Sequence, residues 1–332
     1  MLVLGIDTSC DDTCAAVLKD DFEILSSVVS SQDEVHGRFG GVVPELASRK
    51  HVENIIPIID HALSSARAAL SDIDVIAVTR GPGLVGSLVV GVSAAKALSL
   101  SRSIPLLGIN HIEGHIASSF LTPNRPAYPF VALVVSGGHT NLYIARREGE
   151  YMLMGQTLDD AAGEAFDKVA KLLGLGYPGG RAIESAANRV RGEPVEFTRP
   201  YMKKGSHDFS FSGIKTAARN VVAAAEALDE ALIGRIAAGF QEAVIDVLVS
   251  KTLDLARRES IDTIVVTGGV AANTRLRTVM DERASKRGTR VLLPPKHLCT
   301  DNAAMIAAVG RIRAHEAALN NLTLNAVSRW TI

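Results

Sequence analysis

Two histidines, His111 and His115, stand four residues apart in the stretch NHIEGHIAS, which we predict to be helical. Side chains at positions i and i+4 lie one above the other on one face of a helix, so both imidazoles can reach a single ion. Imidazole is the commonest side-chain ligand of transition metals in proteins. The pair therefore predicts either a metal site or two histidines whose hydrogen bonds are satisfied within the protein.

The spacing of this pair differs from that of a zinc peptidase. The His-Glu-x-x-His motif places a glutamate directly after the first histidine, where it activates the metal-bound water. Here Ile112 occupies that position, and Glu113 projects about 200° around the helix from His111. A peptidase of that type is therefore disfavoured, and a metal would need a third ligand from elsewhere.

Asp301, in the stretch CTDNAAM, can supply that third ligand. It stands at the head of a predicted final helix over about 301–319, which we expect to return to the first half of the protein. Two imidazoles and a carboxylate, with coordination positions left open, suit Fe²⁺ or Zn²⁺.

The composition limits the classes of function. The 332 residues are 47% hydrophobic and 21% charged, with a net charge of −1, so any nucleic-acid surface has to be local or supplied by a partner. Three cysteines without a CxxC pair fit a reducing compartment. Neither a signal peptide nor a membrane-length apolar segment is recognisable, so we expect a cytoplasmic protein that does not enter a membrane.

Short β-branched runs alternate with longer segments of helical periodicity, which is typical of an α/β protein with buried strands. The predicted strands are VLGID, CAAVL, IDVIAVT, VALVVS, LYIAR, IDTIVVT and RVLLP. The predicted helices cover 45–70, 84–100, 161–173, 215–227 and 232–259. GYPGGR and the stretch from RGEPVEF to FSFSG are expected to be loops.

The chain also resembles itself. Residues 73–79, IDVIAVT, and 261–267, IDTIVVT, agree at five of seven positions, and a strand, a polar loop and a second strand precede each of them. This repeated order predicts two duplicated, ribonuclease H-like lobes. Two such lobes around a nucleotide cleft form the plan of the actin/Hsp70/sugar-kinase superfamily.

The same reasoning gives domain boundaries. The predicted parts are 1–110 plus about 297–332 for the N-terminal lobe, 111–129 for a metal-binding helix and linker, and 130–296 for the C-terminal lobe with an insertion near 150–215.

Polar loops join the paired strands of each lobe. Asp7 to Thr13 reads DTSCDDT, and Ser136 to Thr140 reads SGGHT. Backbone amides and hydroxyls in such loops can hold phosphate, and paired glycines let a backbone approach a ligand closely. The same residue types also favour ordinary tight turns, so both interpretations stand.

Two further stretches suggest nucleotide contacts, and a third matches a nucleotide-binding motif only in part. VTGGVAANTRL ends a strand and opens a helix, which makes an amide-lined cradle with Asn273 available to a base or ribose. Asp167 and Glu184 could accept hydrogen bonds from ribose hydroxyls. RGPGLVGS matches the dinucleotide fingerprint but lacks the acidic residue expected about 20 positions later, so we interpret it as a structural turn.

Basic and aromatic residues gather between 199 and 219, and such a mixture suits either an RNA surface or a solvated loop. The basic members are Arg199, Lys203, Lys204, Lys215 and Arg219, and the aromatic members are Tyr201, Phe209 and Phe211.

Together, the motifs resemble the TsaD family of tRNA N6-adenosine threonylcarbamoyltransferases, formerly described as O-sialoglycoprotein endopeptidases, in its bacterial branch. The resemblance runs almost from end to end. It is carried by DTSCDDT, HGRFGGVVPELASRKH, RGPGLVGSLVVG, NHIEGH, VSGGHT, DDAAGEAFDKVAKLLGLGYPGG, FSFSGIKT, GGVAANTRLR and CTDNAAMIA. One departure is that Asp7 and Asp12 stand where many relatives carry glutamate.

The resemblance implies an acyltransferase. Such an enzyme moves the threonylcarbamoyl group from threonylcarbamoyl-AMP to N6 of the adenosine 3′ to the anticodon, in tRNAs that read codons starting with A, and releases AMP. The implied partners are tRNA, an inactive paralogue that forms a heterodimer with the enzyme, and a P-loop ATPase.

Carried over residue by residue, the resemblance also implies a site. The metal ligands would be His111, His115 and Asp301, holding one divalent ion, with Fe²⁺ ranked ahead of Zn²⁺. The substrate contacts would be Val135, Ser136, Gly137, Gly138, His139, Asp167, Gly180, Glu184 and Asn273. Asp11 or His139 would accept the proton of the attacking amine, and the sequence does not choose between them.

Three other classes of protein fit the sequence less well. A metal-dependent glycoprotein endopeptidase would need a glutamate at position 112. A small-molecule kinase of the same fold would need neither the HxxxH pair nor SGGHT. A non-catalytic scaffold would be expected to lack the two histidines.

Overall fold

The computed structural model describes residues 1–200, 205–319 and 321–332. The chain divides into two compact units, which are described separately. Unit 1 comprises Met1–Val35, Val42–Arg125 and Pro294–Ile332, and unit 2 comprises His36–Gly41 and Pro126–Leu293. The lobe boundaries expected from the sequence stay a prediction.

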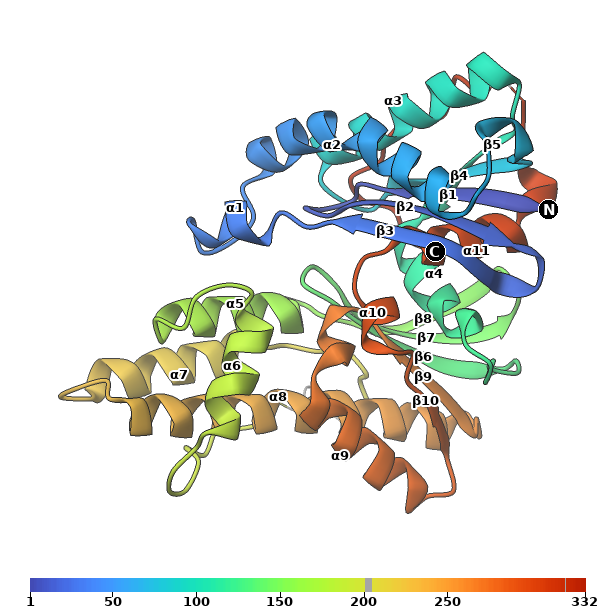
Figure 1. Cartoon of the computed structure of the whole chain (residues 1–332). Helices are drawn as coiled ribbons and strands as arrows, with labels where there is room; N and C mark the ends of the chain where they lie inside the picture. Colours follow the sequence, from blue (N-terminus) through green and yellow to red (C-terminus); the bar gives the residue numbers. More distant parts are fainter. Residues whose placement is uncertain (201–204, 320) are drawn as a thin grey trace. The chain divides into compact units, whose positions relative to one another are not determined.

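Unit 1 is built on a five-stranded sheet. Its strands are β1 (Leu2–Asp7), β2 (Thr13–Lys19), β3 (Glu23–Ser30), β4 (Val75–Gly81) and β5 (Leu106–Asn110). Their order across the sheet is β3-β2-β1-β4-β5 (Figure 1). β1 pairs antiparallel with β2 and parallel with β4, and β4 pairs parallel with β5. The carboxyl ends of β1, β4 and β5 therefore meet at one edge.

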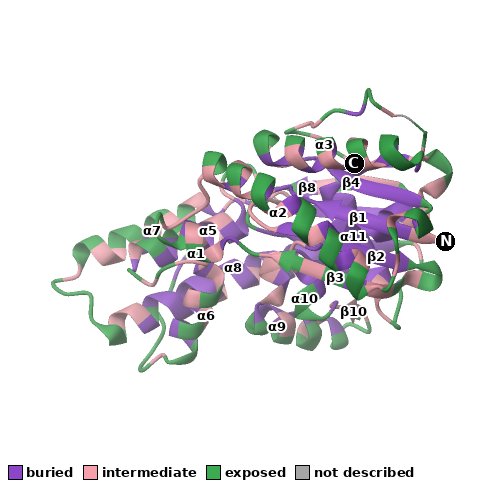
Figure 2. Ribbon diagram, turned by 45° about the horizontal axis from the view of Figure 1, so that its top comes forward, coloured by how far each residue is buried: buried purple, intermediate pink, exposed green. Residues whose placement is uncertain are grey.

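Helices cover both faces of this sheet (Figure 1). The covering helices are α2 (Pro44–Ser65), α3 (Val85–Arg102) and α11 (Ala303–Ile312). The short helices α4 (His111–Ala117) and α10 (Lys296–Cys299) also belong to unit 1, and α1 (Asp33–Gly37) begins in it. Leu4 of β1 packs with Ile55 of α2 and Val92 of α3. Its neighbour Val3 packs with Ile306 of α11. Alternate residues of one strand thus enter separate cores, and β1 lies almost wholly buried (Figure 2).

Unit 2 repeats this sheet. Its strands are β6 (Phe130–Val135), β7 (Thr140–Arg147), β8 (Glu150–Gln156), β9 (Thr263–Thr267) and β10 (Arg290–Leu292), in the order β10-β9-β6-β7-β8. β6 pairs antiparallel with β7 and parallel with β9, as β1 does with β2 and β4. IDVIAVT and IDTIVVT therefore run through equivalent strands, and the predicted duplication is confirmed.

The two copies differ in the helices that come after their third strand. Among the described residues between β8 and β9, unit 2 carries the helices α5 (Ala162–Leu172), α6 (Gly179–Asn188), α7 (Ser212–Ala224) and α8 (Glu230–Arg258). Helix α9 (Thr274–Ser285) comes after β9. Phe166 of α5 meets Phe240 of α8 edge to face, with ring centroids 5.2 Å apart. This aromatic pair joins α5 to α8.

Several elements differ from the predictions. β3, β5 and β8 were not predicted, and all three lie at sheet edges, where β3 and β8 bury few residues and show little alternation. GYPGGR was expected to be a loop, but α6 begins within it at Gly179. Burial of Ile183 and Ala186 stabilises this helix despite its glycine start. The final helix is shorter than expected and ends at Ile312.

The interpretation of 199–219 as a base-stacking surface is wrong for its described aromatic residues. Phe209 and Phe211 are 0% exposed and stack on each other with ring centroids 6.1 Å apart, so they belong to the core. Arg199 Nε donates to Asp246 Oδ2 at 3.0 Å, and Lys215 pairs with Asp160. Tyr201, Lys203 and Lys204 lie outside the described residues.

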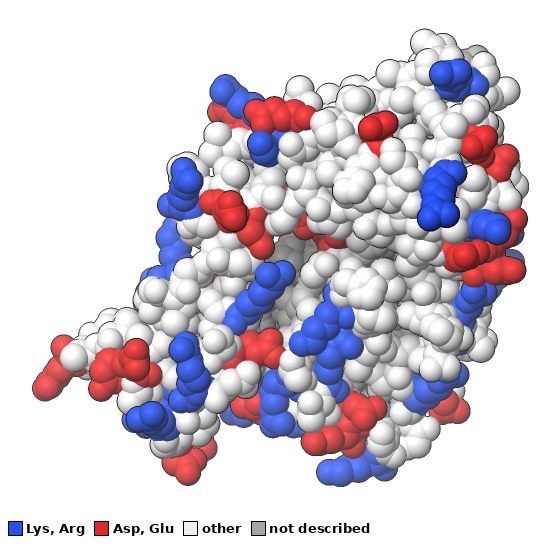
Figure 3. Space-filling model, in the orientation of Figure 1, with Lys and Arg blue, Asp and Glu red and all other residues white. Residues whose placement is uncertain are grey.

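The surface charge is mixed. On the face shown in Figure 3, lysine and arginine side chains lie among aspartate and glutamate side chains. Within the described part of the chain, no helix has both the length and the apolar character needed to cross a membrane.

Candidate metal and nucleotide sites

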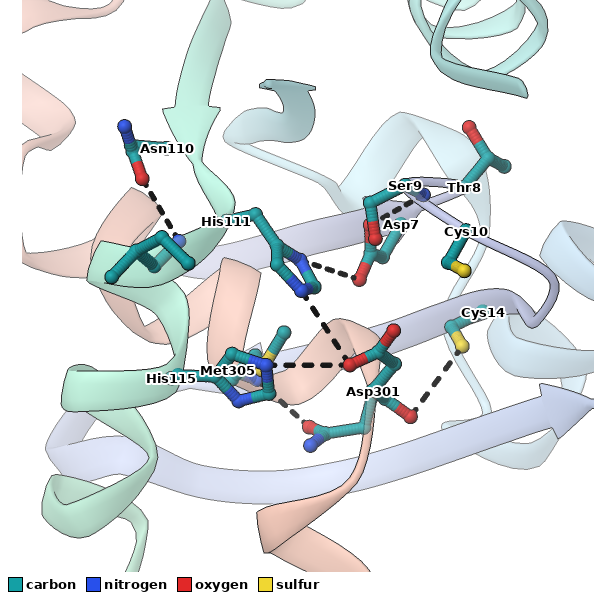
Figure 4. Close-up of polar contacts among 12 residues, drawn as sticks. Asp7, Thr8, Ser9, Cys10, Cys14, Asn110, His111, His115, Asp301 and Met305 are labelled. Carbon is teal, nitrogen blue, oxygen red and sulfur yellow. Dashed lines mark hydrogen bonds and ion pairs between the residues drawn. The ribbon is translucent and has the colours of Figure 1, made fainter. Parts of the chain in front are cut away.

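The structure brings His111, His115 and Asp301 together in unit 1. β5 runs directly into α4, so His111 is the first residue of that helix and His115 lies one turn later. Asp301 approaches from the link between α10 and α11. One ligand atom of each residue lies within 4.8 Å of the others, and Figure 4 shows the three side chains converging.

The geometry of this cluster fits a divalent metal ion. His115 Nε2 lies 3.3 Å and His111 Nε2 lies 3.5 Å from the same oxygen, Asp301 Oδ1. His115 is completely buried, yet neither of its ring nitrogens has a hydrogen-bond partner among the described residues. Buried polar atoms normally have partners, and imidazole with carboxylate is a donor set for Fe²⁺ or Zn²⁺. The residues present therefore fit such an ion.

The protonation of the cluster is set by burial and by its carboxylates. Burial lowers the pKa of His115 and favours the neutral imidazole that binds metals. Burial acts in the same direction on His111, but Asp301 and Asp7 outweigh it and raise the pKa of His111 to about 10. The two histidines hold the pKa of Asp301 well below its usual range, although burial opposes this. Binding of a metal here has to release a proton from His111.

Asp7 is a further residue of this cluster whose place beside His111 was missed in the sequence. Its Oδ2 lies 3.3 Å from His111 Nδ1, both atoms are buried, and neither has a hydrogen bond elsewhere among the described residues. Asp7 Oδ1 accepts from the Ser9 N–H at 3.0 Å. A carboxylate beside the far nitrogen of a metal-binding histidine fixes its tautomer and orientation. The available signal was that Asp7 ends β1 and His111 comes directly after β5, at one edge of the sheet.

Glu113, two positions after the first histidine, pairs with an arginine and not with the cluster. The carboxylate of Glu113 accepts a hydrogen bond from Arg313 Nη1 at 2.9 Å, and Glu113 is 2% exposed. This pairing agrees with the sequence argument against a His-Glu-x-x-His peptidase.

The loop after β1 is fixed by a buried histidine. His51 Nδ1 lies 2.8 Å from Thr13 Oγ1, and His51 Nε2 lies 3.0 Å from the carbonyl oxygen of Cys10. Asp11 and Asp12 lie between these two anchors. Burial, Asp301 and Asp11 together raise the pKa of Asp12 to about 8. Asp12 in this loop therefore holds its proton more tightly than an aspartate in an exposed turn would.

In unit 2, the loop between β6 and β7 forms a tight turn. The Ser136 N–H donates to the His139 carbonyl at 2.8 Å, and the His139 N–H donates to Ser136 Oγ at 3.2 Å. Gly137 and Gly138 are exposed at its tip, and no atom would lie within 4 Å of a Cβ at either position. Their backbone is thus open to a ligand.

The start of α5 bonds to this turn, and further hydrogen bonds join α5 to α6 and α6 to α9. The Gly163 N–H of α5 donates to the Ser136 carbonyl at 3.2 Å. Asp167 of α5 accepts from the Gly179 N–H of α6 at 2.8 Å, and only glycine fits there because a Cβ would lie 2.5 Å from the Asp167 Cα. Glu184 of α6 accepts from the Thr274 N–H of α9 at 2.8 Å. Backbone hydrogen bonds thereby join the elements that carry Ser136, Asp167 and Glu184, three of the predicted substrate contacts.

Asn273 is engaged within the protein. Its Oδ1 accepts from the Leu276 N–H at 2.9 Å and caps α9, and its Nδ2 donates to Gln241 Oε1 at 2.8 Å. Its side chain thus orients the start of α9, and its contact with a base or ribose stays a prediction. Of the two candidate bases, Asp11 lies in unit 1 and His139 in unit 2.

A sequence profile described as "TsaD: tRNA N6-adenosine threonylcarbamoyltransferase" matches residues 23–308. The chain is 53% identical over 335 residues to the tRNA N6-adenosine threonylcarbamoyltransferase of Syntrophus aciditrophicus (strain SB), covering 100% of this chain and 98% of that protein. It is 50% identical over 333 residues to the protein of the same name from Syntrophotalea carbinolica, covering 100% and 97%. The chain belongs to the TsaD family.

Solved structures share the fold of this TsaD-family chain. T. kodakarensis HypF has a TM-score of 0.63 at 13% identity, covering 95% of this chain and 48% of that chain. Component A of the Acidaminococcus fermentans (R)-2-hydroxyglutaryl-CoA dehydratase has a TM-score of 0.54 at 17% identity, covering 95% and 99%. Together with the two duplicated sheets, these likenesses confirm the predicted actin/Hsp70/sugar-kinase type of fold.

We expect Asp7→Asn to weaken Zn²⁺ binding about 10- to 100-fold, because His111 loses the carboxylate that orients its ring. The dissociation constant is measured by competition with a chromophoric chelator. Asp60→Asn, on the exposed surface of α2, is the matched control and should bind as the wild type does. Equal affinities for Asp7→Asn and wild type would contradict the role of Asp7.

We expect Gly180→Ala to weaken binding of AMP roughly tenfold, or about 1.4 kcal/mol, by placing a methyl group where the nucleotide contact is predicted. The unfolding free energy should not fall, because a Cβ there meets no atom within 4 Å and alanine favours a helix. Gly213→Ala, the equivalent second residue of α7 and also in open space, is the control. AMP affinity is measured by calorimetry, and an unchanged value would remove Gly180 from the site.

Proposed function

We propose that this protein transfers the threonylcarbamoyl group from threonylcarbamoyl-AMP to N6 of the adenosine 3′ to the anticodon, in tRNAs that read codons starting with A, and releases AMP. The observation that carries the proposal is membership of the TsaD family along almost the whole chain. The metal cluster of unit 1 and the linked nucleotide contacts of unit 2 support it independently. We place the reaction in the cytoplasm.

The chemistry explains why both clusters are needed. The substrate is a mixed carbamic–phosphoric anhydride, and the exocyclic amine of adenosine is a poor nucleophile. We propose that His111, His115 and Asp301 hold one divalent ion, Fe²⁺ ahead of Zn²⁺, which when bound supplies positive charge to the phosphate of the leaving AMP. Asp7, whose Oδ2 lies 3.3 Å from the far nitrogen of His111, would orient that ring.

The residues of unit 2 would hold the adenylate. The exposed backbone of Gly137 and Gly138 provides donors near developing negative charge, and Val135, Ser136 and His139 fix the shape of that turn. Asp167 and Glu184 each accept one backbone hydrogen bond, and a carboxylate retains further lone pairs for ribose hydroxyls. Gly180 and Asn273 complete the proposed set.

Two residues are proposed for removing the amine proton. His139 closes the SGGHT turn and is half-buried. Asp11 lies beside Asp12 in the loop after β1. Either would accept the proton as general base, and a pH profile of each single variant separates them.

We expect the double variant His111→Ala/His115→Ala to lose its metal and to modify tRNA about 100-fold or more slowly, since Lewis-acid stabilisation contributes several kcal/mol. Metal content is measured by elemental analysis, and threonylcarbamoyladenosine by mass spectrometry of tRNA nucleosides. His315→Ala removes a histidine whose side chain is 76% exposed and should change neither quantity. Full activity in a metal-free double variant would exclude the metal role.

We also propose a partner surface on α2 and α3. Val52 and Ile56 of α2 are 64% and 59% exposed, and Val85 and Val89 of α3 are 56% and 49% exposed. Each pair is spaced i, i+4, and the two helices touch where a Cβ at Gly86 would lie 2.5 Å from Ser48 Oγ. Exposed apolar side chains on two neighbouring helices suit a partner surface. The inactive paralogue implied by the resemblance is the proposed occupant, and a P-loop ATPase is the second proposed partner.

We expect Val89→Asp to weaken the complex with the paralogue roughly 30-fold or more, because a charge is buried in an apolar interface. Dissociation constants come from sedimentation of the purified pair. Leu319→Asp, at a residue that is 58% exposed outside α2 and α3, should leave the complex intact. Equal weakening by both variants would show that the surface is not the docking site.

A further inference from the structure

We infer that the segment Val327–Trp330 positions the metal-binding helix of unit 1, and that Asn110 transmits its influence to His111. The inference rests on the metal site of the proposed function. It adds Asn110, Arg80 and Trp330 as positioning residues for that site.

Asn110 connects the segment to the helix. It is completely buried at the junction of β5 and α4. Its Oδ1 accepts from the Ile112 N–H at 2.8 Å and caps α4, as Figure 4 shows, while its Nδ2 donates to the carbonyl oxygen of Trp330 at 3.1 Å. The oxygen of the Asn110 amide thus contacts α4, and its nitrogen contacts the segment Val327–Trp330. A movement of the segment would therefore disturb the hydrogen bond that caps α4.

The segment is held against the end of β4 by three contacts. The Val327 N–H donates to the Arg80 carbonyl at 2.7 Å, and the Gly83 N–H donates to the Ser328 carbonyl at 3.3 Å. The Arg80 guanidinium lies over the indole of Trp330, 5.0 Å from the ring centroid. Gly81, with φ of +159°, permits this approach, because a side chain there would collide with the Val327 carbonyl. The two hydrogen bonds join backbone atoms, so the cation–π contact between Arg80 and Trp330 is the one that a side-chain substitution can remove.

The dependence of His111 on this cap follows from the length of α4. The helix has seven residues, too few to be stable without its flanking contacts, and His111 is its first residue. Loss of an N-cap destabilises the first turn of a helix. An Asn110 amide that loses the Trp330 carbonyl is free to rotate away from Ile112, and the first turn then loosens.

Metal binding and docking of the segment Val327–Trp330 should affect each other equally. If the docked segment favours the metal-binding arrangement of His111, then metal binding must stabilise the docked segment by the same factor. Trp330 is the single tryptophan of the chain, so its fluorescence reports on the segment alone.

The first experiment compares Zn²⁺ dissociation constants of purified variants by competition with a chromophoric chelator. We expect Trp330→Ala to bind about tenfold more weakly, as for other outer-shell partners of metal ligands. Trp330→Phe keeps an aromatic ring over Arg80 and should restore binding to within about twofold of wild type. Arg329→Ala, an exposed neighbour in the same segment, is the control and should bind as wild type does.

The second experiment uses the wild type and remains decisive if Trp330→Ala does not fold. Saturating Zn²⁺ should lower the acrylamide quenching constant of Trp330, and it should have no effect in His115→Ala. The inference is overturned if folded Trp330→Ala binds Zn²⁺ as tightly as the wild type does. It is also overturned if the wild type binds Zn²⁺ but its acrylamide quenching constant does not change. A wild type that binds no Zn²⁺ at all instead overturns the metal site on which the inference rests.

Discussion

The attraction between one carboxylate and two buried imidazoles is the interaction around which unit 1 is arranged. Asp301 Oδ1 lies 3.3 Å from His115 Nε2 and 3.5 Å from His111 Nε2, although Asp301 is distant in sequence from the two histidines. Removing such groups from water is costly unless opposite charges or a metal compensate for it. The parallel pairing of β1, β4 and β5, the direct passage from β5 to α4, and the link into α11 are all required to bring them together.

The duplication shows how one topology supports two kinds of chemistry. The loop after β1 is acidic and is held by His51, whereas the equivalent loop after β6 is glycine-rich and is held by the start of α5. Side chains fill the first loop and present charge, while the second presents backbone amides. The fold fixes where each loop stands, and the residues within it decide which groups the loop presents.

The repeated strand order and the histidine pair could be predicted from the sequence, because buried strands and i, i+4 pairs leave periodic signals. The edge strands β3 and β8 could not, since half-exposed residues show little alternation. Asp7 was read as a loop residue, because its distance from His111 depends on strand pairing rather than on sequence spacing. Phe209 and Phe211 were misread for a related reason, since sequence composition does not tell a buried aromatic pair from an exposed one.

The uneven burial of the three ligands determines the route by which an ion would exchange. The side chains of His115 and His111 are 0% and 6% exposed, whereas that of Asp301 is 24% exposed. Solvent therefore reaches the cluster from the Asp301 side, and an ion entering or leaving meets the carboxylate first and His115 last.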